Sequence, residues 1–408
     1  MPRRSGLVVL VAVVGPGLLA GLSDDDPAGI TTYSILGADY GYELLWVLAL
    51  STAALILFHE LGARMGVVTG EGLAGLVRYR YGVRVGLAAL LALVVANVGT
   101  AAAAFAGIAA ALELAHVPRW LSAPIAAVAI AVLVLRGTFK RIEHVLIAAC
   151  SVFVAYVFAA LLADPNWGEA ARGLVVPRLP ATSEALLAAT AVVGTTLAPW
   201  GLAFIQSYAV DKRLHPRDLG YERVDVVAGA LLTGLIGFFV VVACAATLHA
   251  QGRSIEDAAD AAVALEPVAG RFASVLFAAG LLGAGLIAAA ILPLSTGYSV
   301  SELFGSEAAL DDSFRDAPLF YTTYVVVIVA AVGFVVAPGV PLVQVLYLTQ
   351  ALNAILLVPL LVLVLGLARD RDLMGVHALG RVGTVVTATT IALIGVCVAA
   401  LGVLAVLG

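Results

Sequence analysis

Long apolar stretches and short polar connections alternate along the chain, and the apolar stretches form eleven segments. They cover roughly residues 6–38, 42–66, 83–114, 118–137, 141–163, 183–211, 224–250, 268–303, 319–337, 341–367 and 383–407. Each can cross a bilayer as a helix, which takes about 20 residues. The segments are continuous and rich in Ala, Leu and Val, without strict alternation. They therefore predict an all-α integral membrane protein with eleven transmembrane helices.

Composition strengthens this prediction. The 408 residues are 62% hydrophobic and 12% charged, whereas a soluble domain carries about 25% charge. A chain of this length then forms a single transmembrane domain, residues 1–408. The net charge of −5 and the lack of a basic patch do not indicate nucleic acid, and no Gly-rich phosphate loop indicates a nucleotide. Cys150, Cys244 and Cys397 lie apart in apolar segments and lack disulfide or metal-site spacing.

The basic residues give an orientation. With a cytoplasmic N-terminus, 17 of the 22 Lys and Arg residues fall on the cytoplasmic side. The other five fall outside, and they are Arg119, Arg172, Arg178, Arg253 and Arg271. Because cytoplasmic connections are enriched in Lys and Arg, this bias predicts a multi-pass protein of the cell membrane with its N-terminus in the cytoplasm. The bias also supports an odd number of helices. A missed helix would move every later connection to the other side and mix the cytoplasmic and outside basic residues.

Two segments carry a helix break in corresponding places. Segment 6–38 is interrupted by Asp26–Gly29 (Asp-Pro-Ala-Gly), and segment 183–211 by Ala198–Gly201 (Ala-Pro-Trp-Gly). They are the first and sixth segments, so one repeat has five helices, and an odd number inverts the second repeat relative to the first. Paired Gly/Pro-interrupted helices in inverted halves are typical of a transporter's midplane binding site. A proline kink in each helix is the alternative interpretation.

Carboxylates accompany the first break. Residues 24–26 are all aspartate, and these are the acidic residues that lie well within a span. An intramembrane carboxylate is costly unless it is paired or hydrated. No basic residue lies deep in any span, so we expect an external cation as the partner, with Asp26 before the proline as its first ligand. His59 and Glu60 lie near the cytoplasmic end of the second segment, where Glu60 and Arg64 predict an i,i+4 ion pair.

An ordered set of motifs indicates a family. The motifs are Gly15–Gly17, Asp26–Ser34, Gly41–Trp46, Ala63–Gly70, Gly194–Gly201, Ile291–Gly297 and Gln350–Asn353. Together they resemble the Nramp divalent-metal transporters, and more closely their magnesium-transporting branch. The resemblance implies a LeuT-type inverted repeat of five plus five helices and one extra helix, with helices one and six unwound at the midplane. Repeat one would cover about 6–163, repeat two about 183–367 and the extra helix about 383–407.

Both breaks depart from the family pattern. Nramp proteins carry Asp-Pro-Gly-Asn in the first helix and Met-Pro-His-Asn in the sixth. This chain has Gly29 in place of the first asparagine and Ala198 in place of the methionine. A thioether suits transition metals, whereas Mg²⁺ prefers oxygen ligands and keeps several waters. Gly29 and Ala198 also leave space where the family has side chains, so we expect a roomier, oxygen-lined site.

The resemblance also bears on proton coupling. Nramp proteins couple metal to protons through a histidine in the sixth helix and acids in the third. This chain has Trp200 at the histidine position, and Ala101 and Ala104 at the positions of the acids. The magnesium-transporting branch keeps a glutamate where Ala104 lies, so one anionic group is missing from the expected site. We therefore expect uncoupled cation entry driven by the membrane potential.

The sequence thus predicts facilitative transport of a partly hydrated divalent cation, Mg²⁺ first and Mn²⁺ second, by alternating access. The predicted metal site comprises Asp26, Asp24, Ser23, Gly29, Thr195, Ala198 and Gln350, with backbone carbonyls contributing near Ser23 and Thr195. Trp200, Gly201 and Ala104 would shape the cavity, unless Trp200 only packs. The cation and the lipid bilayer are the expected partners. No enzymatic residue, resident cofactor, nucleic acid or nucleotide is expected, and an oligomer is not required.

Other functions fit less of the pattern. The first is a proton-coupled importer of transition metals. The second is a transporter of an organic solute such as an amino acid, on the same inverted-repeat architecture. Its half-helix N-termini would bind a carboxylate, which three neighbouring aspartates would repel. An intramembrane aspartyl protease needs two carboxylates from separate segments, whereas the deep acids here come from one break.

Overall fold

The structure, a computed structural model, describes residues 24–135, 154–256, 258–306 and 314–407. This part of the chain is helical, without strands. The longer helices are α3 (Pro27–Tyr40), α4 (Leu45–Thr69), α6 (Val83–Glu113), α7 (Arg119–Leu135), α11 (Ser183–Thr196), α12 (Pro199–Asp211), α13 (Leu219–Thr247), α16 (Ala273–Phe304), α17 (Pro318–Val335), α18 (Leu342–Ala368) and α20 (Arg381–Leu407). The shorter helices are α5 (Leu73–Tyr81), α9 (Val154–Leu162), α10 (Trp167–Val175), α14 (Ala258–Ala262), α15 (Glu266–Ala269) and α19 (Arg371–Met374).

Eight stretches of the described residues are long and apolar enough to cross a membrane. They are α4, α6, α11 with α12, α13 with its flanking turns, α16, α17, α18 and α20. Helix α7 is apolar but shorter. The predicted first and fifth segments, 6–38 and 141–163, lie partly outside the described residues. The count of eleven therefore stays a prediction.

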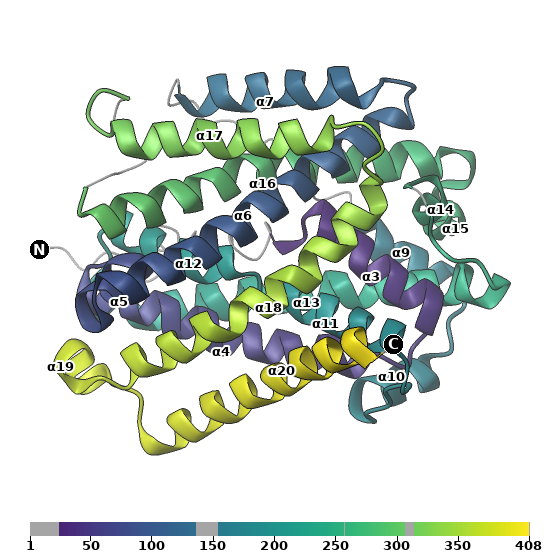
Figure 1. The fold of residues 1–408 in the computed structure, drawn as a ribbon. Helices are drawn as coiled ribbons and strands as arrows, with labels where there is room; N and C mark the ends of the chain where they lie inside the picture. Colours follow the sequence, from purple (N-terminus) through teal and green to yellow (C-terminus); the bar gives the residue numbers. More distant parts are fainter. Residues whose placement is uncertain (1–23, 136–153, 257, 307–313, 408) are drawn as a thin grey trace, which may run out of the picture.

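The long helices run between two ends of the molecule that carry the short ones. Helices α5 and α19 lie at one end, and α10, α14 and α15 lie at the other (Figure 1). Helices α7 and α17 pack together on one flank, and α20 lies on the opposite flank against α11 and α18. Helix α6 packs against α16, α17 and α18, and α11 packs against α18. The helices with the breaks, α3 and α11–α12, are thus enclosed by neighbours.

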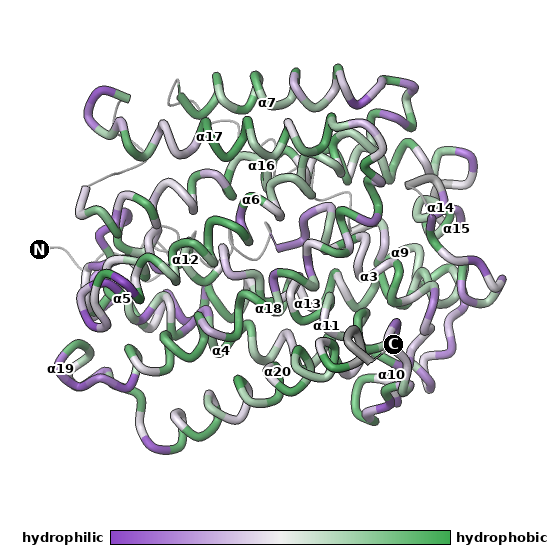
Figure 2. Tube along the Cα trace, in the orientation of Figure 1, coloured by the Kyte–Doolittle hydropathy of each residue, from purple (hydrophilic) through white to green (hydrophobic). Residues whose placement is uncertain are grey.

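The outward faces of the flanking helices are apolar. Figure 2 shows hydrophobic positions along the long helices and hydrophilic ones gathered at the two ends. Large apolar side chains are more than half exposed on these faces, for example Leu91 on α6, Ile125 and Val128 on α7, and Val326 and Val329 on α17. A soluble protein rarely exposes so many contiguous apolar side chains. This pattern is typical of a helical bundle whose outer faces contact lipid.

Glycine permits the closest crossing beside the second break. A Cβ atom added at Gly194 on α11 would overlap the backbone carbonyl oxygen of Gln350 on α18, and it would lie 2.7 Å from the Ala354 nitrogen. Backbone atoms cannot rotate away as a flexible side chain can. Small residues allow this approach, which supplies packing energy between helices in a membrane. Gly194 therefore fixes the distance between α11 and α18.

Replacing Gly194 with alanine is expected to destabilise the protein by about 3 kcal/mol or more, because one methyl group would force the two backbones apart. Thermal unfolding in detergent, followed by tryptophan fluorescence, measures this loss. Gly333→Ala on α17 is the matched control, since a Cβ atom there meets nothing within 4 Å. Equal melting temperatures for the two variants would contradict the tight crossing.

Candidate functional site

The second break lies between α11 and α12. Helix α11 ends at Thr196, and Leu197 leaves the helical conformation with φ −114° and ψ 41°. Ala198 is the N-cap of α12, with ψ 134°, and Pro199 opens the helix. Proline disfavours the helical conformation in the residue before it, and it fits the first helical position because it has no N–H to leave unpaired. The Ala-Pro sequence therefore ends one helix and starts the next.

The first break follows the same rule with a stronger cap. Asp26 precedes Pro27 and has an extended backbone, with φ −72° and ψ 171°. Its Oδ1 accepts a hydrogen bond from the Gly29 N–H at 2.6 Å. A side-chain oxygen at the N-cap satisfies one of the free N–H groups of the first helical turn. The Asp26 carboxylate is thus held at the N-terminus of α3, where the helix dipole favours negative charge.

The two breaks meet at Gly29. The position of a Cβ atom at Gly29 lies 2.8 Å from the Asp24 carbonyl oxygen, 3.3 Å from the Thr195 Oγ1 and 3.4 Å from the Asp26 Oδ1. A carbonyl, a hydroxyl and a carboxylate oxygen therefore surround one point between the breaks. The expectation of free space beside Gly29 is wrong, because the Asp24 carbonyl occupies the place that a side chain would need.

The aspartates of the first break are deeply buried. Asp24, Asp25 and Asp26 are 2%, 1% and 5% exposed. The carboxylate oxygens of Asp24 and Asp25 accept no hydrogen bond from any described residue. No Lys or Arg side chain is buried within the described ranges. An ionised carboxylate in an apolar interior needs a partner, and a bound cation would supply it.

Oxygen dominates the groups around these carboxylates. Across the residues that the structure describes, no group of three or more His, Cys, Asp and Glu side chains converges as a ligand set for a metal. A cation at the breaks would therefore be bound by few side chains together with backbone oxygens, the Thr195 hydroxyl and water. Such an environment suits a hard cation that keeps part of its hydration shell.

Helices α6 and α16 pack against Pro27 at the first break. A Cβ atom added at Gly107 on α6 would overlap the Pro27 ring, and one at Gly285 on α16 would lie 3.3 Å from its Cγ. The Ala104 carbonyl oxygen lies 3.1 Å from the same Gly285 position. Ala101 and Ala104 are fully buried. The face of α6 that packs against Pro27 of α3 therefore consists of Gly107 and, one and two turns before it, of alanines, and it carries no carboxylate.

The second break is tied to its surroundings by hydroxyl groups. The Thr196 Oγ1 on α11 lies 3.0 Å from the Tyr33 hydroxyl on α3, so these two helices are hydrogen-bonded to each other. The Ser295 hydroxyl of α16 donates to the Trp200 carbonyl oxygen at 3.2 Å. The Trp200 ring is buried and lies 6.1 Å from the Phe204 ring, centroid to centroid. These contacts indicate that Trp200 packs within α12.

The other predicted site residues are placed as follows. Ala198 is buried at the break itself. The Gln350 side chain accepts from the Asn353 Nδ2 at 3.0 Å, and Asn353 also donates to Thr100 on α6 at 2.9 Å. No hydrogen bond joins Gln350 to the aspartates in the part of the chain that the structure describes. Ser23 lies outside the described residues.

The sequence interpretation missed His59. Its Nε2 lies 3.1 Å from the position of a Cβ atom at Gly201, and the Asp24 Oδ1 lies 3.5 Å from the same position. His59 is therefore beside the second break and not only near a helix end. A signal was present, because Gly62 and Gly66 follow it at spacings of three and seven and pack against α12. Small residues at such spacing mark the face of a helix that approaches a neighbour.

The ion pair predicted on the same helix is confirmed. Arg64 Nε donates to the Glu60 Oε1 at 3.0 Å, and Arg223 of α13 donates to the same oxygen at 2.8 Å. Both arginines are at least partly exposed. Consecutive helical residues point about 100° apart. Glu60 therefore faces the arginines while His59 faces α12.

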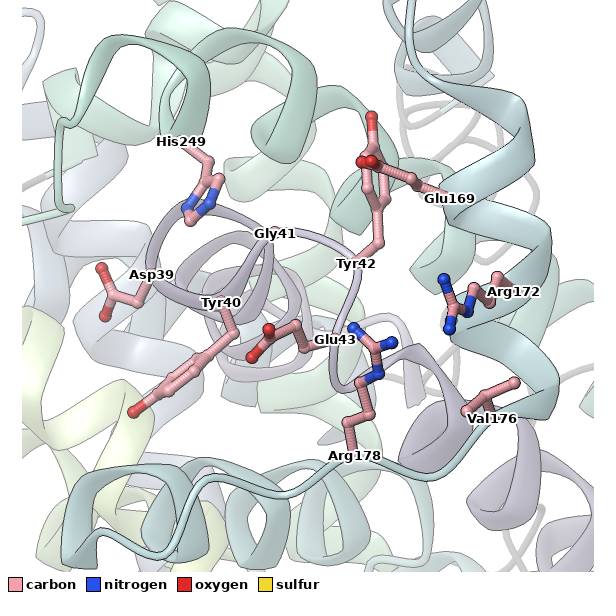
Figure 3. A pocket seen from close by; sticks show the side chains of 11 residues that line it. Asp39, Tyr40, Gly41, Tyr42, Glu43, Glu169, Arg172, Val176, Arg178 and His249 are labelled. Atoms are coloured by element: carbon pink, nitrogen blue, oxygen red, sulfur yellow. The ribbon is translucent and has the colours of Figure 1, made fainter.

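A surface cavity of about 400 Å³ lies at the far end of α3. Figure 3 shows its ionisable side chains, among them the acids Asp39, Glu43 and Glu169, the arginines Arg172 and Arg178, and His249. Helix α3 has 14 residues, so this cavity is about 20 Å from Asp26 at a rise of 1.5 Å per residue. Its two arginines offset two of its three acids, and it lies apart from the buried aspartates of the first break. It opens at the end of the molecule that carries α10.

Comparison with known proteins decides the family. The family model for natural resistance-associated macrophage protein-like (Nramp) proteins matches residues 17–404. The chain belongs to the Nramp family. It is 31% identical over 407 residues to the divalent metal cation transporter MntH of Burkholderia ambifaria, which covers 96% of this chain and 89% of the relative. It is 32% identical over 285 residues to MntH of Acidiphilium cryptum, covering 67% of this chain and 65% of the relative.

Solved structures show the same fold for this Nramp protein. The manganese transporter of Eremococcus coleocola superposes with a TM-score of 0.78 at 19% identity, covering 97% of this chain and 87% of that one. Mhp1, a nucleobase-cation-symport-1 family transporter, superposes with a TM-score of 0.60 at 16% identity, covering 95% and 90%. The chain is thus an all-helical, multi-pass membrane protein of a transporter family with a LeuT-like fold. The expectation that it is not an enzyme is confirmed.

Proposed function

We propose that this Nramp protein moves a partly hydrated divalent cation across the membrane by alternating access, Mg²⁺ first and Mn²⁺ second, without proton coupling. The observation that carries the proposal is the burial of Asp24, Asp25 and Asp26 with no basic partner among the described residues. A cation from outside the protein would balance those that are ionised. The MntH relatives, named divalent metal cation transporters, and the structurally similar manganese transporter support a divalent metal as the cargo.

The oxygen-rich surroundings support a hard cation. Asp26, Asp24 and the Thr195 hydroxyl lie about Gly29, and we assign them to the metal together with the backbone at Ala198 and Ser23. Gln350 is the candidate ligand from α18. To bind the metal, its side chain would have to give up its present hydrogen bond with Asn353. No methionine lies at the second break, which removes the soft ligand that transition metals favour. Mg²⁺ and Mn²⁺ both accept such an oxygen environment.

The transport cycle follows from the proposed architecture. Eleven helices, arranged as five plus five and one extra, would place the broken helices one and six at the midplane. The end of the molecule with α5 and α19 would be cytoplasmic. Arg78 and Arg80 of α5 and Arg371 of α19 are among the 17 Lys and Arg residues predicted on the cytoplasmic side. The N-terminus would then be cytoplasmic and the cavity in Figure 3 would face outward. The cation would enter from that side.

Flux into proteoliposomes tests the proposal. Vesicles with the purified protein receive external Mg²⁺ or Mn²⁺, and a metal indicator and a pH indicator inside record both movements. We expect either metal to enter with no acidification of the lumen. Entry of neither metal would overturn the proposed cargo. Acidification driven by metal, and absent without it, would overturn the uncoupled mechanism while leaving divalent transport in place.

A proton-coupled importer of transition metals is the second candidate. One observation favours it, since the His59 imidazole lies near Asp24 and is a borderline ligand. The relatives include proteins named MntH, and one similar structure is a manganese transporter. The pH record in the same vesicles distinguishes this candidate from the uncoupled one. An organic anion such as an amino acid has less support, because three buried carboxylates would repel its own.

A further inference from the structure

Two buried polar groups face one point on α12 across Gly201. The His59 Nε2 comes from α4 and the Asp24 Oδ1 from the first break, and both lie within 3.5 Å of the place where Gly201 would carry a Cβ atom. His59 is 3% exposed and Asp24 is 2% exposed. Any side chain at residue 201 would lie between them. With glycine at this position, no side chain separates the His59 ring from the Asp24 carboxylate.

Neither the Asp24 carboxylate nor the His59 ring has a hydrogen-bond partner among the described residues. Both carboxylate oxygens of Asp24 lack a hydrogen bond in this part of the chain, and no described residue forms a hydrogen bond with the His59 ring. Buried polar groups are normally hydrogen-bonded. A nitrogen donor and an unpaired carboxylate that face a common point are therefore suited to a cation, held directly or through its water.

The backbone of α4 fixes His59 in this place. Gly62 and Gly66, one and two turns further along α4, allow close contact with α12, and a Cβ atom at Gly66 would lie 2.5 Å from the Gln206 carbonyl oxygen. The helix cannot rotate without losing this contact. His59 therefore points toward the break because the glycines hold α4 against α12.

We infer that His59 is a metal ligand that gives the pathway its capacity for borderline transition metals, such as Co²⁺ and Ni²⁺, beside hard cations. This inference rests on the proposed function, because it concerns the selectivity of the same cation pathway. The other groups about the breaks offer oxygen. An imidazole nitrogen adds affinity that rises from Mn²⁺ through Co²⁺ to Ni²⁺ and adds little for Mg²⁺.

Two substitutions separate the nitrogen from the volume of the side chain. His59→Gln keeps a polar group of similar reach but replaces the nitrogen donor by an amide oxygen, and His59→Leu removes every donor. In proteoliposomes we expect both variants to reduce the Co²⁺-to-Mg²⁺ flux ratio by about tenfold or more, as for a lost metal contact. Mg²⁺ flux should stay within about twofold in His59→Gln, where an oxygen remains. The exposed loop residue His116, replaced by Gln, is the matched control.

A spectroscopic readout tests the same ligand without transport. Mn²⁺ is added to the purified protein, and electron spin echo modulation reports whether an imidazole ¹⁴N is bound to the metal. We expect this modulation in the parent and in His116→Gln, and its loss in His59→Gln. A parent spectrum without imidazole modulation, or an unchanged flux ratio in both His59 variants, overturns the inference. If the parent protein transports neither Mg²⁺ nor Co²⁺ into proteoliposomes, the proposed function fails. The Mn²⁺ spectrum of the purified protein still decides whether His59 is a ligand.

Discussion

Asp26→Asn is expected to abolish cation flux while leaving the fold intact. The Asp26 side chain has two separable roles, since it caps α3 through the Gly29 N–H and carries one of the buried charges. Asparagine caps a helix about as well as aspartate, so the variant keeps the break and the packing of Pro27. It loses the charge that would bind the cation. We expect flux to fall by about 100-fold, as for a lost metal ligand.

Asp26→Ala separates the two roles further. It should lose flux to the same extent and, in addition, about 1 kcal/mol of stability, because the Gly29 N–H loses its cap. Asp164→Asn, in the exposed turn after α9, removes the same charge outside the breaks and outside the cavity of Figure 3, and it should transport like the parent. Initial rates of Mg²⁺ and Mn²⁺ entry and the melting temperature in detergent measure both effects. Parental flux from Asp26→Asn would refute Asp26 as a ligand.

Local chemistry explains why the breaks can be located from the sequence. A proline restricts the conformation of the residue before it and ends helical hydrogen bonding. Asp26 and Ala198 are therefore extended whatever helices pack around them. Their ψ values of 171° and 134° follow from that restriction. The Glu60–Arg64 ion pair is likewise a neighbour relation within one helix. Features that depend on a few consecutive residues were therefore accessible to prediction.

Features that depend on contacts between helices were not. The space expected beside Gly29 is filled by the Asp24 carbonyl, and this follows from how the chain enters α3 rather than from the identity of residue 29. His59 lies beside Asp24 because Gly62 and Gly66 bring α4 against α12. A single sequence shows the glycines but not which helix they approach. Sequence reasoning therefore located the acids of the candidate site and missed the histidine that lies near Asp24.

A membrane potential is expected to drive metal accumulation if entry is uncoupled. One elementary charge gains about 2.3 kcal/mol across 100 mV, so a divalent cation gains about 4.6 kcal/mol. At equilibrium that corresponds to an internal concentration on the order of 1,000 times the external one. The structural basis is that α6 contacts the first break at Gly107 and carries the buried Ala104 and Ala101 one and two turns before it, so this face of α6 has no acid to take up a proton. The expectation applies to Mg²⁺ and Mn²⁺ alike.

A potassium diffusion gradient with valinomycin sets the potential, negative inside, and the luminal metal is recorded until it is constant. Vesicles with equal potassium on both sides should reach only the external concentration, and Asp26→Asn vesicles should show the passive leak. Luminal pH should stay constant throughout. If a proton gradient at zero potential drove the metal above its external concentration, coupling would be present. Because α6 offers no acid where it packs against the first break, the aspartates of the break and His59 would be the first groups to test as the proton carrier.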